Sequence, residues 1–291
     1  MSRNLIIGGL GFLGSYLARQ LMEKGEEVYI FDLADGSKLT DSVKDKLNII
    51  RGDLTDWAQI SSAVSTNDIE CIYHLAALLP PVSEQNLNTT FMVNIGGTVH
   101  VFEAARLFKV ASVIFLSTIA TYGLGLPRLV NEDIPQLPRN MYGTTKVCCE
   151  RLGEQYHRQY GVNFRGVRFP PVLGASRRDS AQSAFSYLAI RESVLGRPYA
   201  MYVDRETSMP TIYVKDAIAS LISLKEAREE KLKRRMYNIH GFSFRAADLS
   251  AEIVKNVPEA QLSFKPDDTM LDSINNWPIL DDTHAREEWG W

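Results

Sequence analysis

The chain has 291 residues, of which 45% are hydrophobic and 23% charged, and its formal net charge is −3. A chain of this length can bury a full core in one large domain, or in one domain with a smaller lobe. The slightly negative charge gives no electrostatic basis for binding nucleic acid or an anionic membrane surface, so we expect neither partner. No run of about 18 uncharged apolar residues is present, which argues against a membrane span.

The cysteines indicate the compartment. Cys71, Cys148 and Cys149 show no disulfide pattern and no Cys-x-x-Cys pair for zinc. The N-terminal apolar stretch is short and broken by glycines, unlike a signal peptide. We therefore expect a protein of the reducing cytoplasm without a metal site.

A short apolar run at 4–7 predicts a strand, and a glycine-rich turn and a helical pattern follow it. Glycines at such a junction permit a tight turn and let the backbone approach a pyrophosphate, which the helix N-terminus attracts. A glycine-rich turn without a ligand has the same local sequence, so the motif needs support from the rest of the chain. The residues predicted to face a cofactor here are Gly8, Gly11, Phe12, Leu13 and Gly14.

The second predicted strand, 27–31, ends at Asp32, about 20 residues past the glycines. An acid at this place accepts hydrogen bonds from the ribose hydroxyls of NAD and repels the additional phosphate of NADP. No arginine follows Asp32 directly. We therefore predict that NAD is the cofactor, with Asp32 and Leu33 beside its ribose.

The third and fourth predicted strands, 47–51 and 70–74, add to the same site. Asp53 and Leu54 follow the third strand and are predicted to meet the adenine. The competing interpretation places Asp53 at the start of a helix that Thr55 or Asp56 caps. His74 lies within an apolar run, so we interpret it as hydrogen-bonded inside the fold rather than as a base. The small residues after it would let a cofactor approach closely, and the predicted contacts are Leu75, Ala76 and Ala77.

A helix is predicted at 88–108, and a fifth strand at 113–116 delivers Ser117 and Thr118 at its carboxyl end. Ligands bind beyond the carboxyl ends of strands in open parallel sheets. The Thr118 hydroxyl is therefore placed to bind a substrate oxygen.

Tyr142 and Lys146 are four residues apart in a predicted helix at 141–160, so they lie on one face. A free phenol has a pKa of about 10 and is a poor base at neutral pH. A lysine ammonium one turn away, together with the positive ring of an oxidised nicotinamide, favours the phenolate. We interpret Tyr142 as a proton-transfer residue, although Tyr-x-x-x-Lys also arises by chance.

A sixth predicted strand, 162–169, ends at two prolines. Six strands alternating with helices predict an α/β fold with a doubly wound parallel Rossmann sheet. We assign residues 1–170 to an NAD-binding domain and residues 171–291 to a smaller C-terminal lobe for substrate. Helical stretches at 181–195 and 214–227 and short strands at 199–203 and 236–240 are assigned to that lobe, with segments that interleave with the sheet.

Taken together, these residues resemble the extended short-chain dehydrogenase/reductase family. The matching motifs are Gly8-x-x-Gly11-x-x-Gly14, Asp32, Asp53-Leu54, His74 to Ala77, Asn94, Ser117-Thr118, Tyr142-x-x-x-Lys146 and Arg168-Phe169-Pro170. The resemblance implies catalytic roles for Thr118, Tyr142 and Lys146. It also implies cofactor contacts from Tyr142 and Lys146, and from Asn94, Ser117, Phe169 and Pro170.

Within that family the chain is most similar to the short-chain type of L-threonine 3-dehydrogenase, over nearly its whole length. This resemblance implies a homodimer that oxidises a small secondary alcohol. Two segments depart from that type: Pro80 replaces a serine, and residues 176–183 replace a glycine-rich segment leading into Thr-Thr-Asp. Both help form the substrate pocket in the family, so we place Pro80 and Arg177 at the substrate with Thr118 and Tyr142, and we expect threonine to be a poor substrate.

The rival interpretation is a nucleotide-sugar epimerase or dehydratase, which uses the same tyrosine and NAD. Such relatives carry an arginine for the diphosphate where this chain has 209–211, Met-Pro-Thr. Arg177, Arg178 or Arg205 could replace it. A non-catalytic NAD sensor is a third class, but it would not need Thr118, Tyr142 and Lys146 together.

Overall fold

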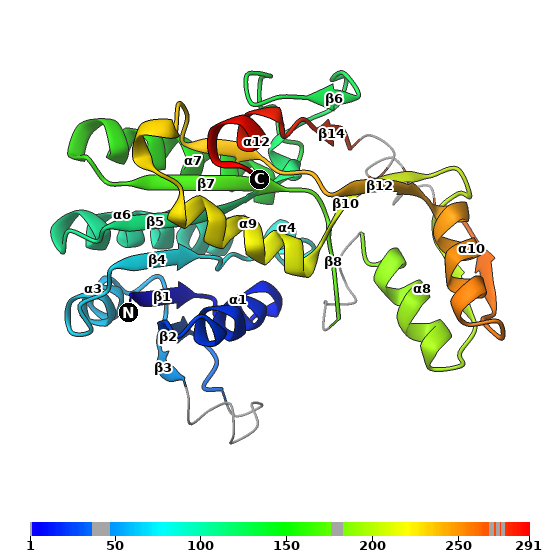
Figure 1. Cartoon of the computed structure of the whole chain (residues 1–291), viewed down its shortest axis with the longest axis horizontal. Helices are drawn as coiled ribbons and strands as arrows, with labels where there is room; N and C mark the ends of the chain where they lie inside the picture. Colours follow the sequence, from blue (N-terminus) through cyan, green and yellow to red (C-terminus); the bar gives the residue numbers. More distant parts are fainter. Residues whose placement is uncertain (1, 37–46, 176–182, 268–270, 272–273, 275–276) are drawn as a thin grey trace.

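The computed structural model describes residues 2–36, 47–175, 183–267, 271, 274 and 277–291. Within them, a seven-stranded parallel sheet has the order β11-β7-β5-β4-β1-β2-β3 (Figure 1). Its strands are β1 Arg3–Ile7, β2 Glu27–Asp32, β3 Asn48–Arg51, β4 Cys71–His74, β5 Ser112–Thr118, β7 Phe164–Phe169 and β11 Met236–Asn238. The predicted doubly wound Rossmann sheet is confirmed, and the strand order reverses between β1 and β4.

Helices cover both faces of this sheet because the strands bury side chains on both sides (Figure 1). Ile6 packs toward one face and its neighbours Leu5 and Ile7 toward the other. The helices of the Ile6 face are α1 Phe12–Glu23, α9 Val214–Glu226 and α12 Thr283–Trp289. Those of the opposite face are α3 Trp57–Ser65, α6 Gly97–Leu107 and α7 Met141–Tyr160.

Two segments that the sequence analysis assigned to the C-terminal lobe belong to the layers of the sheet. β11 pairs with β7, and Gly166 makes room for it, since a Cβ there would lie 2.5 Å from the Met236 sulfur. α9 packs against α1, with Ile218 and Leu221 beside Leu17. Periodicity gives the type of an element but not its partner, so the sequence could not indicate which of the interleaving segments would return to the sheet. The division of the chain at residue 170 stays a prediction.

The predicted helix at 88–108 is divided. The structure has α5 Leu87–Thr90, a π-helical turn η1 Phe91–Gly96, and then α6. Within this region the Thr98 hydroxyl donates to the Asn94 carbonyl oxygen at 2.5 Å. Hydroxyl groups that bond back to the preceding turn compete with the helical pattern and bend it, and π-helical turns are frequent at functional sites.

The lobe has its own apolar cluster, built around Phe185, Met201, Met209, Ile253 and Ile274. It contains α8 Phe185–Val194 and α10 Ala246–Asn256 (Figure 1). Its strands are β8 Val172–Leu173, β9 Tyr199–Met201, β10 Ser208–Tyr213, β12 Phe242–Arg245 and β13 Leu262–Phe264. β10 bonds to β8 and β12, and β9 to β13.

The remaining described elements are short. They are α4 Val82–Gln85, η2 Ile119–Thr121, β6 Leu129–Val130, η3 Glu229–Lys231 and β14 Ile279–Leu280. β6 pairs with β14, which joins the loop after β5 to the C-terminal segment. None of the described helices is both long and apolar enough to cross a bilayer.

Candidate active site

The turn between β1 and α1 has a shape that requires glycine. Gly8 has a φ of +83°, and a Cβ there would lie 2.9 Å from the Ala76 Cα atom. A Cβ on Gly14 would lie 2.4 Å from the Gly8 carbonyl oxygen. Gly11 is the N-cap of α1, with Phe12 and Leu13 in its first turn, and no described side chain caps this N-terminus. Its first N–H groups are thus available to an anion such as a pyrophosphate.

Asp32 lies at the carboxyl end of β2, beside this turn. Its carboxylate accepts hydrogen bonds from the Leu10 N–H at 3.0 Å and the Ala34 N–H at 3.1 Å. Leu33 is 68% exposed next to it. A hydrogen-bond acceptor at the end of β2 and an uncapped helix N-terminus match the hydroxyls and phosphates of NAD, so these residues fit the cofactor.

Asp53 and Leu54 follow β3. One Asp53 carboxylate oxygen accepts from both the backbone and the hydroxyl of Thr55, each at 2.8 Å. Asp56, the other candidate from the sequence, caps α3 by accepting from two of its backbone N–H groups. Leu54 is buried against Gly97. Asp53 therefore shapes the turn before α3, and its contact with adenine stays a prediction.

Asn94 fixes the segment that follows β4. This segment begins with Leu75, Ala76 and Ala77. The Asn94 amide accepts from the Leu78 N–H at 2.7 Å and donates to the Leu78 carbonyl oxygen at 3.1 Å. It also donates to the Thr145 hydroxyl on α7 at 3.1 Å. All three bonds are made within the protein, so Asn94 holds the segment after β4 in place. A direct contact between Asn94 and the cofactor stays a prediction.

Tyr142 lies in the first turn of α7, where Asn140 is the N-cap and accepts from the Gly143 N–H at 2.8 Å. Its phenol lies beside the side chain of Thr118, the last residue of β5. Burial raises the pKa of Tyr142 above its ordinary value, and the nearby Thr118 side chain lowers the pKa in part. The structure therefore brings together the two predicted groups that would meet the substrate oxygen.

Lys146 is 3% exposed, one turn further along α7. Its Nζ atom donates to the Leu116 carbonyl oxygen at 2.7 Å and lies 5.9 Å from the centre of the Tyr142 ring. Burial lowers the pKa of Lys146 to about 8. Lys146 and an oxidised nicotinamide are expected together to favour the Tyr142 phenolate. In the chain alone burial raises the Tyr142 pKa, and the effect of Lys146 with NAD bound stays a prediction.

Below these residues lies a buried ion pair that the sequence analysis missed. Arg168 on β7 donates to the Glu150 carboxylate at 2.6 Å, and both side chains are almost fully buried. The Ser117 hydroxyl donates to the same carboxylate at 2.5 Å. The Arg168 guanidinium also donates to the Tyr122 hydroxyl at 2.8 Å. Glu150 is eight residues after Tyr142, a spacing that places both on one face of α7 and could have indicated it.

His74 is a buried, uncharged group. Its Nε2 atom lies 2.8 Å from the Thr98 hydroxyl oxygen, which itself donates to a backbone carbonyl, so Nε2 is the donor. Burial lowers the pKa of His74 to about 3. The interpretation of His74 as an internal hydrogen-bonding residue is confirmed.

The structure describes some of the remaining predicted site residues but not Arg177 and Arg178. Phe169 is buried at the end of β7, followed by Pro170. Pro80 lies in the loop between β4 and α4. Arg177 and Arg178 lie outside the described residues, so their place is a prediction. Arg205 stacks over the Phe264 ring, with its guanidinium carbon 4.9 Å from the ring centre.

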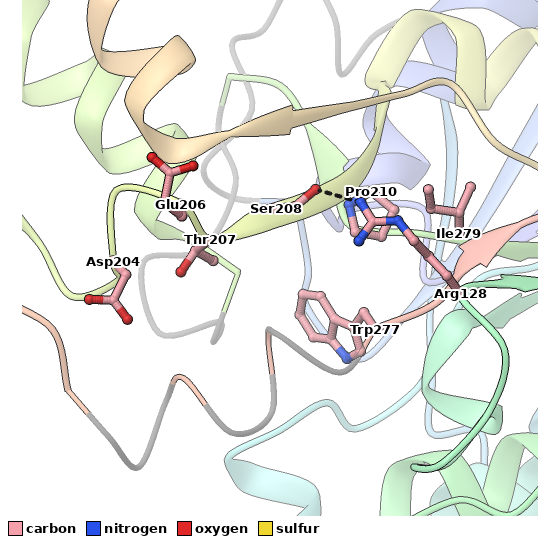
Figure 2. A pocket seen from close by; sticks show the side chains of 8 residues that line it. All are labelled: Arg128, Asp204, Glu206, Thr207, Ser208, Pro210, Trp277 and Ile279. Carbon is pink, nitrogen blue, oxygen red and sulfur yellow. Dashed lines mark hydrogen bonds between the residues drawn. The ribbon is translucent and has the colours of Figure 1, made fainter.

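A cavity of about 260 Å³ opens in the lobe (Figure 2). Its lining residues are Arg128, Asp204, Glu206, Thr207, Ser208, Pro210, Trp277 and Ile279. The Thr207 hydroxyl is buried and has no hydrogen-bond partner among the described residues. Trp277 also packs in the cluster that contains Ile119, the residue after Thr118. This cavity was not predicted, because residues 204–210 meet Arg128, Trp277 and Ile279 only in the folded chain.

Across the described ranges, no group of three histidine, cysteine, aspartate or glutamate side chains is arranged to hold a metal ion. The polar groups of the site are hydroxyls, a phenol, an amine and carboxylates on separate strands and helices. Such groups bind ribose and phosphate and move protons.

The chain is similar in sequence and fold to several known proteins. The family model described as the NAD dependent epimerase/dehydratase family matches residues 4–239. The mitochondrial L-threonine 3-dehydrogenase of Bos taurus is 33% identical over 99% of this chain and 78% of its own. An uncharacterized epimerase/dehydratase of Staphylococcus haemolyticus is 30% identical over 100% of this chain and 92% of its own.

Among solved structures, a GalE-like L-threonine dehydrogenase from Cupriavidus necator in its holo form has a TM-score of 0.91 at 29% identity, over 99% of this chain and 94% of that chain. A UDP-glucose 4-epimerase from Thermotoga maritima shares the fold, with a TM-score of 0.88 at 22% identity, over 99% of this chain and 93% of that chain. The chain thus belongs to the NAD dependent epimerase/dehydratase family, and it is an enzyme that oxidises a hydroxyl group with NAD.

Proposed function

We propose that the protein is a dehydrogenase that oxidises the secondary alcohol of a small β-hydroxy compound and releases the ketone. The observation that carries this proposal is the position of the Tyr142 phenol beside the Thr118 side chain, with Lys146 one turn further on. A phenol in that place can receive the substrate hydroxyl proton, and the threonine can orient the same oxygen.

The chain's own residues have distinct roles in this reaction. NAD, when bound, supplies the hydride acceptor and a positive ring. Tyr142 accepts the hydroxyl proton, and Thr118 holds the substrate oxygen beside it. Lys146 contributes a buried positive charge, and its Nζ atom can bind ribose hydroxyls. The turn at Gly8 and Gly14, with Asp32, holds the other end of the cofactor.

The charges near the lobe favour a small amphoteric substrate over a nucleotide sugar. The cavity has one guanidinium, from Arg128, and two carboxylates, from Asp204 and Glu206. Because Arg245 pairs with Glu206 at 3.0 Å, Arg128 and Asp204 remain. This pair offers no net positive charge to a doubly negative diphosphate, whereas it can bind a molecule that carries both charges. Arg205, one candidate for a diphosphate, stacks on Phe264 instead. The Bos taurus and Cupriavidus necator relatives are named as threonine dehydrogenases, which supports a β-hydroxy amino acid or an analogue.

Threonine itself is proposed to be a poor substrate of this chain. Proline has no N–H to donate. Pro80 stands where the threonine dehydrogenases that this chain resembles carry a serine. We propose that a bulkier or more acidic hydroxy compound is preferred, and that Arg177 takes part in binding it.

The test is NADH formation across a panel of hydroxy acids and hydroxy amino acids at equal concentration. NADH release with at least one of them is expected, with threonine below the best compound. Threonine with the highest specificity constant, at about ten thousand per molar per second or more, would overturn the substrate proposal. Turnover only of a sugar nucleotide, without net NADH, would instead identify an epimerase.

The proposed assembly is a homodimer. Four large apolar side chains are exposed within residues 82–92, on α4, α5 and η1, namely Val82, Leu87, Phe91 and Met92. Exposed large apolar side chains concentrated in one segment are typical of an interface. One structural neighbour is described as a monomeric L-threonine 3-dehydrogenase, so the state must be measured. Light scattering should show a dimer for the wild type and a monomer for Phe91→Asp. A monomeric wild type would reject the proposal.

The proposed compartment is the cytoplasm. The cysteines Cys71, Cys148 and Cys149 are all free thiols, and two of them are buried. Free thiols are typical of reducing compartments. Fractionation of the source cells should recover the protein with cytoplasmic markers, and recovery with an organelle would contradict this assignment.

A further inference from the structure

A residue outside every sequence motif connects the segment after β4 to the N-terminus of α7. Glu84, in α4, accepts hydrogen bonds from the Met141 N–H at 2.8 Å and the Tyr142 N–H at 3.2 Å. The Ser83 hydroxyl donates to the same carboxylate at 2.7 Å. These are charge-assisted bonds to the first two backbone N–H groups of α7, where the helix dipole also favours an anion.

Glu84 completes the capping of this helix from a distant part of the chain. Asn140 accepts only the Gly143 N–H with its side chain. The N–H groups of Met141 and Tyr142 have no intrahelical acceptor, as in any first turn. This second cap comes from 57 residues upstream.

A second set of bonds joins the same loop to the same turn. Asn94 binds both backbone groups of Leu78 and donates to the Thr145 hydroxyl. That hydroxyl donates to the Tyr142 carbonyl oxygen at 2.8 Å. The backbone of Tyr142 is therefore held at its N–H by Glu84 and at its carbonyl through Thr145, and both connections lead to the segment that contains Pro80.

We propose that Glu84 is a positioning residue that couples the loop carrying Pro80 to the phenol of Tyr142. The proposal rests on the function proposed above. The Glu84 carboxylate links the position of this loop to the first turn of α7, so that the phenol meets the Thr118 hydroxyl. A displacement of about 1 Å in a reacting group can cost a hundredfold in rate. Glu84 acts through the backbone and does not touch the reacting atoms.

The test compares Glu84→Ala and Glu84→Gln with a matched control, Asn86→Ala. Asn86 lies in the same loop and caps α5 by accepting the Thr89 N–H at 3.0 Å, without a hydrogen bond to α7 among those of the described residues. We expect kcat to fall about ten- to a hundredfold in Glu84→Ala. Glu84→Gln keeps one acceptor oxygen, so its kcat should lie between those of the wild type and Glu84→Ala. Asn86→Ala should retain wild-type kcat, and the Kd for NAD should stay within about twofold in all three.

Hydrogen exchange distinguishes a failure of this proposal from a failure of the proposed function. Amides in a peptide covering 139–146 should exchange faster in Glu84→Ala than in the wild type or in Asn86→Ala, whatever substrate the enzyme uses. If the panel identifies an epimerase, its turnover replaces NADH release as the rate, because it would use the same tyrosine. An unchanged kcat in Glu84→Ala, an equal loss in Asn86→Ala, or unchanged exchange at 139–146 would each overturn the coupling.

Discussion

The carboxyl edge of the sheet and the lobe cavity differ in how firmly their polar groups are held. At the sheet, the Asp32 carboxylate accepts hydrogen bonds from two backbone N–H groups. Lys146 is buried, and its amine donates a hydrogen bond to a backbone carbonyl oxygen. In the cavity, the Arg128 side chain makes one hydrogen bond within the described ranges, a 3.5 Å contact with Ser208 that is at the limit of a hydrogen bond. Asp204 and Glu206 are exposed, and Glu206 pairs only with another exposed side chain among those described, Arg245, at 3.0 Å.

This difference has a physical consequence for function. Groups that are held before the substrate arrives need no reorganisation during the reaction, and they stabilise charge best. Side chains that are exposed and weakly bonded can be replaced without disturbing the core. We therefore expect the redox chemistry to depend on the sheet edge, and the choice of substrate to depend on the cavity.

The largest effect should come from removing the phenol at the sheet edge. Tyr142→Phe should fold and bind NAD but lose about a hundredfold to ten-thousandfold in kcat, the usual range for a general base. The matched control is Tyr156→Phe on the same helix, whose hydroxyl binds Glu103 instead. Steady-state NADH formation and calorimetry with NAD measure both properties. Activity of Tyr142→Phe within about threefold of the wild type would place proton transfer elsewhere.

A smaller effect is expected at the other end of the cofactor. Asp32→Ala should weaken NAD binding about ten- to a hundredfold, because charge-assisted hydrogen bonds contribute about 1.5–3 kcal/mol. NADP binding should weaken less or improve, since the repulsion of its phosphate is removed. Asp35→Ala, three residues on, is the control and should keep the preference for NAD. Equal calorimetric affinities of the wild type for the two cofactors would contradict the assignment of Asp32.

The buried histidine gives a pH-dependent test of how rigid the sheet region is. His74 has a pKa of about 3 in the fold and about 6.5 when unfolded. As the pH falls below 6.5 the unfolded chain binds this proton first, so stability is lost down to about pH 3. At pH 5 that loss is about 2 kcal/mol.

The variant His74→Leu should lack this loss. Its free energy of unfolding in urea should fall by about 2 kcal/mol less than that of the wild type between pH 7.5 and pH 5. Both proteins share all other titrating groups, so their difference isolates the histidine. An equal fall in the two proteins would show that water reaches His74 and that the sheet interior is less closed than its burial indicates.

Local pattern was sufficient for most of the sheet. β1, β2 and β4 bury apolar side chains on both faces, and α7 begins at Met141, as the sequence predicted. The turn at Gly8 and the acid at Asp32 could also be found, because each lies at a fixed place relative to one strand.

What could not be predicted depends on contacts between distant segments. The pairing of β11 with β7 joins residues about 70 apart, and periodicity contains no information on partners. Glu84 and Glu150 were missed because one is an ordinary surface acid and the other an ordinary helix acid until the fold brings them to Tyr142 and Arg168. The pKa of Tyr142 depends on burial, which short motifs do not report.

The smallest effect on the fold is expected at the cavity, where Arg128 faces the lobe from the loop before β6. Arg128→Ala should change the free energy of unfolding by no more than about 0.5 kcal/mol, because the side chain is exposed and its one hydrogen bond is long. NAD affinity should not change. The preference for hydroxy compounds with a carboxylate over neutral ones should fall about fivefold, roughly 1 kcal/mol for a weakened ion pair, and Arg128→Lys should restore part of it because the charge returns. Specificity constants across the substrate panel, with urea unfolding alongside, measure this. A variant that loses stability but keeps its preference would show that Arg128 is structural, and that the weakly held side of the molecule does not choose the substrate.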